Sequence, residues 1–155
     1  MKGVPVSMCY NFLMKLFVYS LVILFLSSCS CSKEEATYSP SDMWRLAQKA
    51  EPDIELVPIP TGMDHKRVLC KNYGPGCVEG TGKRIKVKKV ELITIQFDTV
   101  AAARKEARRL DQYHFANWLF DEVKEEPVLK YFVKKVFNAV SPAEEDMAQE
   151  NLERK

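Results

Sequence analysis

Cys70 and Cys77 are the two residues whose type and spacing point most directly to chemistry. The segment between them contains Gly74-Pro75-Gly76, which must turn the chain, so the two thiols face one turn from both sides. In an oxidising compartment such a pair forms a disulfide, and a spacing of six intervening residues matches no common zinc pattern. The sequence therefore predicts a disulfide between Cys70 and Cys77 rather than half of a metal site.

Other candidate chemistry is weaker. The segment 76–84 resembles a phosphate-binding loop superficially, but Cys77 stands where the first glycine belongs and Arg84 replaces the Ser or Thr that would hold magnesium. The two histidines, His65 and His114, have no partner at metal or catalytic-triad spacing. A carboxylate cluster is expected to be a solvated turn rather than a cation site: Asp121, Glu122, Glu125 and Glu126. We therefore predict no catalytic residue, no metal site and no cofactor.

Charge is segregated along the chain. The segment from Lys66 to Arg109 contains twelve basic and four acidic residues, whereas the segments 29–65 and 110–155 are both acidic. A basic strand and helix face would bind an anionic envelope component, such as lipid headgroups or lipopolysaccharide phosphates, or an acidic protein. The candidate residues are Lys83, Arg84, Lys86, Lys88, Arg104, Lys105, Arg108 and Arg109. The equal alternative is that the acidic ends fold over the basic middle and neutralise it internally.

An apolar segment near the N-terminus indicates export. Leu16–Leu26 is uninterrupted by polar residues apart from Tyr19 and Ser20, is preceded by Lys15, and is followed by Ser27-Ser28-Cys29. Eleven residues at a rise of ~1.5 Å cover about half of a ~30 Å hydrocarbon core, whereas the apolar region of a signal peptide typically has ~7–15 residues. We therefore expect residues 1–28 to be a signal peptide. Its start is left open between Met1, Met8 and Met14.

The segment Leu26-Ser27-Ser28-Cys29 resembles the lipobox of bacterial lipoproteins. The resemblance covers these positions and their upstream flank, and it implies lipidation of Cys29 and membrane attachment through the lipid. Ser30 rather than Asp follows, which implies an outer-membrane address, facing the periplasm or the cell surface. Cys31 fits less well, because its own lipobox would lack the leading apolar residue. The alternatives are an uncleaved anchor and an ordinary secretory signal, and export in either form argues against nucleic acid as a partner.

The rest of the chain is expected to form one domain. A content of 46% apolar and 28% charged residues is ordinary for a globular protein. Residues 29–40 are polar and are expected to be a tether, and residues 41–140 a single globular domain. Ser141-Pro142-Ala143-Glu144 is a capping pattern with little apolar sequence after it, so residues 141–155 are either a weak helix or an acidic tail.

Apolar periodicity predicts the elements of the domain. The first part is a helix capped by Ser41 and stopped at Pro52, an edge strand over 53–57, a hairpin that carries the two cysteines, and a long strand over 84–97 with a bulge near Lys88. The second part is a helix capped by Asp98 with Val100, Ala103, Ala107 and Leu110 inward, then a segment over 113–123 that is a strand or an extension of this helix, with the strand favoured, and then a helix from Pro127. In the first helix, Met43, Trp44 and Ala47 are apolar at helical spacing, and in the segment 113–123 one alternating face carries Ala116, Trp118 and Phe120. The last helix has an apolar stripe of Leu129, Phe132, Val133, Val136, Phe137 and Val140.

This order of elements predicts an α+β fold, with a small, largely antiparallel sheet, helices packed on one face, and a part that is ferredoxin-like. For function, the sequence favours a noncatalytic envelope lipoprotein that acts as an interaction or structural module through its basic residues. The alternative is a small envelope enzyme or enzyme accessory whose site has no recognisable motif.

Overall fold

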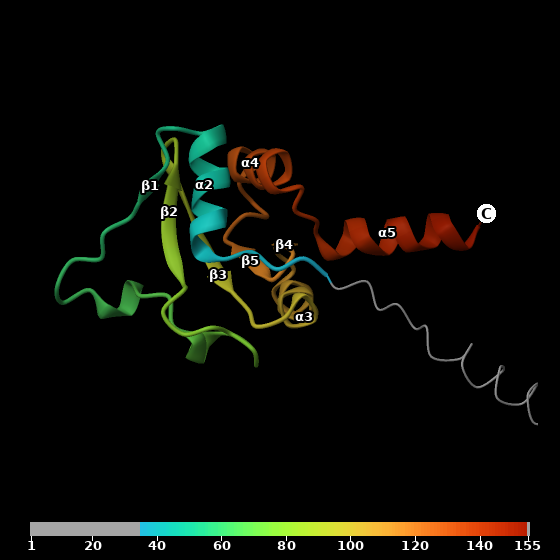
Figure 1. Ribbon diagram of the computed structural model, residues 1–155, viewed down its shortest axis with the longest axis horizontal. Coiled ribbons are helices and arrows are strands. Elements are labelled where there is room, and N and C mark those ends of the chain that lie inside the picture. The colour runs from blue at the N-terminus through green and yellow to red at the C-terminus, as the bar shows by residue number, and fades with distance from the viewer. Residues whose placement is uncertain (1–34, 155) are drawn as a thin grey trace, which may run out of the picture. The chain divides into compact units, whose positions relative to one another are not determined.

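The computed structural model describes residues 35–154, in which five antiparallel strands form one sheet in the order β1-β2-β3-β5-β4 (Figure 1). The strands are β1 (Glu55–Leu56), β2 (Lys83–Val87), β3 (Val90–Gln96), β4 (Tyr113–Phe115) and β5 (Trp118–Asp121). The predicted α+β fold with an antiparallel sheet is confirmed. The short β1 lies at an edge, as predicted, because the prolines that follow it cannot donate hydrogen bonds to a further strand.

The predicted long strand over 84–97 is wrong, because it is a hairpin of β2 and β3. Val87 pairs directly with Val90, so Lys88 and Lys89 form a two-residue turn in which Lys88 has a φ of +59°. The change in apolar phase near Lys88, which predicted a bulge, is therefore a reversal of the chain. A lysine in the left-handed region carries no sequence signal of the kind that Gly or Asn would give.

The segment 113–123 also forms two strands rather than one. β4 and β5 pair through Phe115 and Trp118, and Ala116 turns the chain with a φ of +48°. Ala116 therefore does not share a face with Trp118, contrary to the predicted alternation. Asn117 lies buried in the turn, where its side-chain amide donates to the carbonyl oxygen of Phe97 at 3.1 Å.

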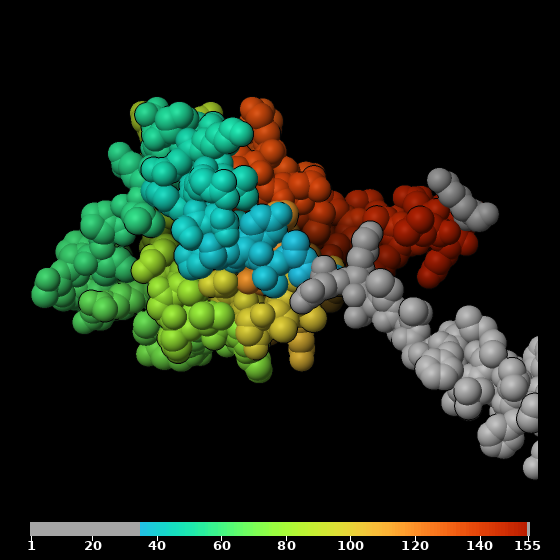
Figure 2. Space-filling view, in the orientation of Figure 1, coloured from blue at the N-terminus to red at the C-terminus, as the bar shows by residue number. Residues whose placement is uncertain are grey.

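Helices α2 (Pro40–Ala50) and α4 (Pro127–Phe137) cover one face of the sheet and lie side by side, α2 in cyan and α4 in orange in Figure 2. α2 is capped by Ser39 rather than by the predicted Ser41, because Pro40 occupies the first helical position, where its missing N–H costs nothing. The principal core lies between these helices and the sheet, and its largest buried members include Leu92, Phe120, Leu129, Phe132 and Phe137.

Helix α3 (Val100–Leu110) lies on the opposite face, so helices cover both faces of the sheet rather than the single face expected from the sequence. Ala103 and Ala107 pack on Ile95, Phe97 and Leu119, as the predicted inward stripe requires. The cap is Thr99 and not Asp98: its hydroxyl accepts a hydrogen bond from the N–H of Ala102. Because β3 and β4 are both antiparallel to β5, which lies between them, β3-α3-β4 is a split βαβ unit, the ferredoxin-like part of the fold.

The segment around the two cysteines and the C-terminal segment were also predicted from the sequence. The cysteines do not flank a hairpin: Cys70 begins the short helix η2 (Cys70–Asn72), which follows η1 (Asp64–Lys66), and Cys77 forms an isolated bridge with Phe97. Residues 142–153 form a helix, α5 (Pro142–Glu153), with Ser141 and Glu144 as a capping box, and α5 extends away from the sheet (Figure 1). The predicted signal peptide, Cys29, Cys31 and the first half of the predicted tether, residues 29–34, lie outside the described residues.

Candidate functional site

The basic residues selected from the sequence come from two separate elements, β2 and α3. Arg84 of β2 donates two hydrogen bonds to the carboxylate of Glu122, at 2.9 and 3.3 Å, and this contact raises the pKa of Arg84. Lys86 lies between Glu55 and Glu91 in the strand register. In the part of the chain that the structure describes, four lysines of the set form no ion pair: Lys83, Lys86, Lys88 and Lys105.

The arginines of α3 are paired with carboxylates. Arg104 lies 3.1 Å from Glu145 and Arg108 lies 3.0 Å from Asp146, and both carboxylates belong to the first turns of α5. Arg104 also contacts Glu35, and Arg109 donates to the buried Glu106. The acidic C-terminal helix therefore covers part of the basic helix, as the internal neutralisation alternative requires.

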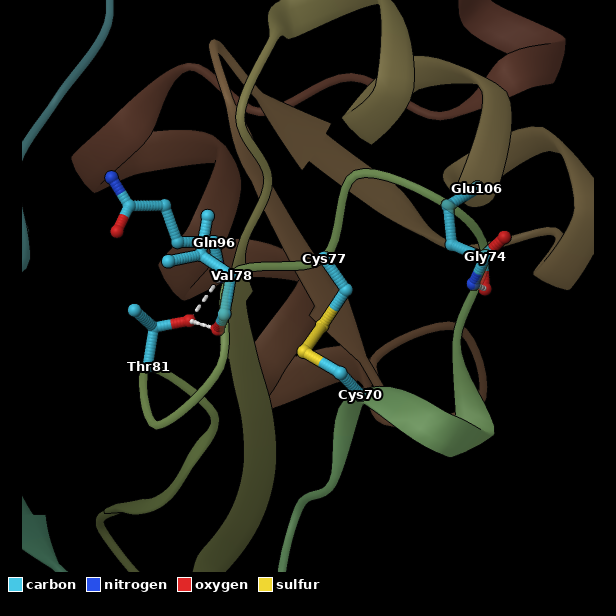
Figure 3. The surroundings of a disulfide bond; sticks show 7 residues. All are labelled: Cys70, Gly74, Cys77, Val78, Thr81, Gln96 and Glu106. Carbon is cyan, nitrogen blue, oxygen red and sulfur yellow. Dashed lines mark hydrogen bonds between the residues drawn. A yellow bond between two sulfur atoms is a disulfide. The ribbon is translucent and has the colours of Figure 1, made fainter.

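Cys70 and Cys77 are joined by a disulfide, with their Cα atoms 5.5 Å apart (Figure 3). Both cysteines pack against the small core between the sheet and α3. The enclosed loop is held to α3 by the main-chain N–H of Gly74, which donates to Glu106 Oε1 at 2.9 Å. Arg109 holds the pKa of Glu106 below its usual value, so this acceptor stays ionised inside the protein.

The chain that leaves the disulfide is fixed to the sheet and then forms a wall of a cavity. Val78 donates its N–H to the carbonyl of Gln96 at 2.9 Å, and the Thr81 hydroxyl donates to the carbonyl of Val78 at 2.6 Å. The N–H of Gln96 donates to the same hydroxyl at 3.2 Å, and Figure 3 shows the two contacts of the Thr81 hydroxyl beside the disulfide. Gly80 and Thr81 are thereby held at the edge of the cavity.

This cavity has a volume of about 220 Å³ and lies between α2 and the sheet. Its wall is contributed by every strand of the sheet except β4, and by α2, α4 and the loop before β2. The lining residues are Pro40, Met43, Trp44, Ala47, Leu56, Gly80, Thr81, Lys83, Ile85, Thr94, Trp118, Phe120 and Phe137. The wall is mainly apolar, and both tryptophans of the chain belong to it.

The polar groups of the cavity are few. Lys83 is the single charged lining residue, and it lies directly across the hairpin from Thr94, whose half-buried hydroxyl makes no hydrogen bond within residues 35–154. The indole N–H of Trp118 is already used, because it donates to the carbonyl of Tyr38 at 2.8 Å. Within the described chain, the cavity therefore offers one cation, the hydroxyl of Thr94 and the indole N–H of Trp44 beside a large apolar surface.

The two histidines have different surroundings. His65 is exposed in η1, whereas His114 of β4 is buried on the α3 side of the sheet, with Nε2 2.8 Å from Glu145 Oε1. Because a carboxylate only accepts, Nε2 carries the proton, and Nδ1 has no hydrogen-bond partner in the described chain. Burial lowers the pKa of His114, although Glu145 acts against this shift. His114 therefore joins the sheet to α5.

The carboxylate cluster and the glycine-rich segment have structural roles. Asp121 accepts a hydrogen bond from the Tyr73 hydroxyl at 3.1 Å, and Glu122 pairs with Arg84. In the segment 76–84, Lys83 begins a strand, whereas a phosphate-binding loop must lead into a helix. Across residues 35–154 no three His, Cys, Asp or Glu side chains are arranged to hold a metal ion.

Sequence reasoning selected Lys83 but did not find the rest of this site. Met43, Trp44 and Phe137 were assigned to apolar helix faces and Trp118 and Phe120 to a strand face, and neither pattern distinguishes a cavity wall from a filled core. The presence of both tryptophans on elements of the same sheet face was the available signal.

In residues 35–154 no helix has the length and apolar content needed to cross a membrane. No known protein family, curated protein or solved structure matches the chain.

Proposed function

We propose that the protein is an exported lipoprotein, anchored to a membrane through Cys29, whose folded part is a noncatalytic module that binds an apolar ligand in the cavity under α2. The observation that carries the proposal is this cavity of about 220 Å³, with its walls from α2, α4 and four strands. Ligand sites are usually concave and mostly apolar, with a few polar groups that orient the ligand.

The size of the cavity supports a ligand rather than a packing defect. Protein interiors are close-packed, and voids much larger than a water molecule are few. An apolar cavity of ~150 Å³ binds benzene, so a cavity of about 220 Å³ accepts roughly nine carbon atoms. The cavity is also reachable from solvent, because Leu56 at its edge is 53% exposed.

The enzyme alternative has less support. The lining residues include no histidine, cysteine or carboxylate, so the cavity offers no side chain that combines a nucleophile with a general base. The buried His114 faces α3, on the opposite side of the sheet. Binding through the basic residues is also less supported than ligand binding in the cavity, since Arg84, Arg104 and Arg108 are paired with carboxylates.

Tryptophan fluorescence tests ligand binding, because the only two tryptophans line the cavity. The full chain in phosphatidylcholine vesicles is titrated with 1-decanol, and a saturable change in emission is expected. Ala47→Leu places extra carbon atoms into the cavity and should weaken binding by at least tenfold. Ala101→Leu, on the exposed face of α3, is the matched control and should leave binding unchanged. Equal binding by both variants, with both still folded by circular dichroism, contradicts the proposal.

The anchor is tested separately by metabolic labelling with a palmitate analogue. Cys29→Ser should remove both the label and the membrane association, whereas Cys31→Ser should keep both. Labelling that survives Cys29→Ser excludes this anchor.

A further inference from the structure

We infer that the ligand of the cavity is a single-chain anionic amphiphile, a fatty-acid-like carboxylate whose head group lies between Lys83 and Thr94 and whose chain lies under α2. The inference rests on the proposed function, since it assigns a ligand class to the same cavity.

The charge of the cavity selects the sign of the head group. Lys83 is the only charged residue in the wall, and it is exposed and forms no ion pair in the chain as described. The nearest basic residue on the same strand, Arg84, is occupied by Glu122 and points to the other face by strand alternation. A ligand with one negative charge could therefore form an ion pair with Lys83 at the edge of a mainly apolar site.

The register of the β2–β3 hairpin fixes the place of the head group. Residues two apart on a strand share a face, so Lys83 stands on the same face as the buried Ile85, above the cavity. Thr94 pairs with Lys83, and directly opposed residues have Cβ atoms roughly 5 Å apart. An ammonium and a hydroxyl at this separation can both donate to the two oxygens of one carboxylate.

The remaining wall fits a chain. Across the sheet from Thr94 lies Phe120, and Met43, Trp44 and Ala47 of α2 form the opposite side. The Trp118 indole N–H donates to Tyr38, so the indole N–H of Trp44 is the one polar side-chain group of this part of the wall without a hydrogen bond within residues 35–154. The volume of about 220 Å³ corresponds to roughly nine carbon atoms by comparison with known apolar cavities, and a longer chain would continue out past the exposed Leu56.

One competing occupant belongs to the chain itself. Pro40 lines the cavity, and the eleven residues from Cys29 span up to ~40 Å when extended, so an acyl group on Cys29 would reach it. Such acyl groups carry no negative head group and leave Lys83 without a partner. The charge of the site therefore favours a separate anionic ligand, and the experiment distinguishes the two.

The test compares decanoate with 1-decanol at a pH of ~8, where the carboxyl group of free decanoate is ionised. The full chain in phosphatidylcholine vesicles is titrated with each probe, decanoate below its micelle concentration and decanol below its solubility limit, and tryptophan emission is recorded. Decanoate should bind more tightly than decanol. Lys83→Gln should lower the ratio of decanoate affinity to decanol affinity about two- to fivefold, the range for a partly exposed ion pair. Thr94→Val should act in the same direction, and the matched control Lys105→Gln should have no effect.

The results that would contradict the anionic ligand differ from those that would contradict the proposed function. If decanoate and decanol bind equally in all variants, the assignment of an anionic ligand is wrong while the proposed function stands. If neither probe binds, the proposed function fails with it. If decanoate binds only to the Cys29→Ser chain, the native occupant is the protein's own acyl group, and the inference is overturned.

Discussion

Loss of the disulfide between Cys70 and Cys77 is expected to destabilise the protein and to loosen one wall of the cavity. The bond closes a ring of eight residues, and the chain-entropy estimate for such a ring is about 8 cal/mol/K, or about 2.5 kcal/mol at 25 °C. The double variant Cys70→Ser, Cys77→Ser should lose at least this amount, because both sulfur atoms also pack against the core beside α3. For a domain of this size the loss is a large fraction of the total stability.

Urea unfolding of the full chain, followed by circular dichroism, measures this effect. The variant and the reduced wild-type protein should unfold at the same lowered midpoint with a similar slope. Cys31→Ser is the matched control and should unfold like the oxidised wild type. A change below ~1 kcal/mol in the double variant would show that the ring contributes little, against the entropy estimate.

The same variant tests the link between the disulfide and the site. Cys77 is followed by the segment in which Val78 and Thr81 bond to Gln96, and Thr81 lines the cavity. Decanol affinity should therefore fall in the folded double variant, with faster hydrogen exchange at Val78. Unchanged affinity and unchanged exchange would refute the idea that the disulfide fixes this wall.

Three further predictions concern stability in urea or thermal unfolding. Burial lowers the pKa of His114 in the folded state, so the unfolded chain binds the proton first as the pH falls. The contribution of His114 to the free energy of unfolding is therefore complete above pH 6.5 and declines as the pH falls below it. His114→Asn should remove this pH dependence of stability, and His65→Asn should keep it. Glu106→Ala leaves a main-chain N–H of the disulfide loop without its acceptor and should cost about 1–3 kcal/mol, with a smaller loss for Glu106→Gln, which keeps an acceptor oxygen. Ala116→Gly relieves a left-handed alanine at a φ of +48° and should stabilise by about 0.5 kcal/mol, whereas the control Ala101→Gly, in the first turn of α3, should give no stabilisation.

The helices were predictable because their apolar residues recur at helical spacing. The inward stripe of α3 through Ala103 and Ala107 is confirmed, as is the stripe of α4 through Leu129 and Val133. The first residues of α2 and α3 were not predictable, since each of these two starts offers two candidate caps, Ser39 and Ser41 for α2 and Asp98 and Thr99 for α3. Which of them accepts the hydrogen bond depends on tertiary packing, as at Ser39, which precedes the well-placed Pro40.

The hairpins were missed for a different reason. Tight hairpin turns are usually recognised in a sequence by Gly or Asn at the positions of positive φ, but here Lys88 and Ala116 adopt that conformation. The contacts on either side of these residues hold them in it. Strands β2 and β3, which flank Lys88, are joined at five paired positions, and Asn117, which follows Ala116, forms hydrogen bonds with Phe97 and Tyr38. Long-range contacts of this kind override local preference and cannot be read from the turn residues themselves.

Neither the pairing of the charged residues nor the cavity could be predicted without the tertiary structure. The sequence left open whether the acidic ends neutralise the basic middle, and the pairing of Arg104 and Arg108 with α5 favours that alternative for the helix. Lys83 was selected for its charge alone. Its significance comes from Thr94 and Phe120, which the sheet places beside it on the same face.

The position of Tyr38 explains why the cavity is preformed rather than a gap that α2 could close. Its N–H donates to Asn117 at 2.8 Å, and its carbonyl accepts from Trp118 at 2.8 Å and from Gln96 at 3.1 Å. These three bonds fix the chain just before α2 to strands β3 and β5, so the helix begins at a set distance from the sheet. A helix held in this way cannot shift toward Thr94 and close the cavity without breaking these partly buried hydrogen bonds. The space beneath α2 therefore persists without a ligand, which lowers the cost of ordering when one binds.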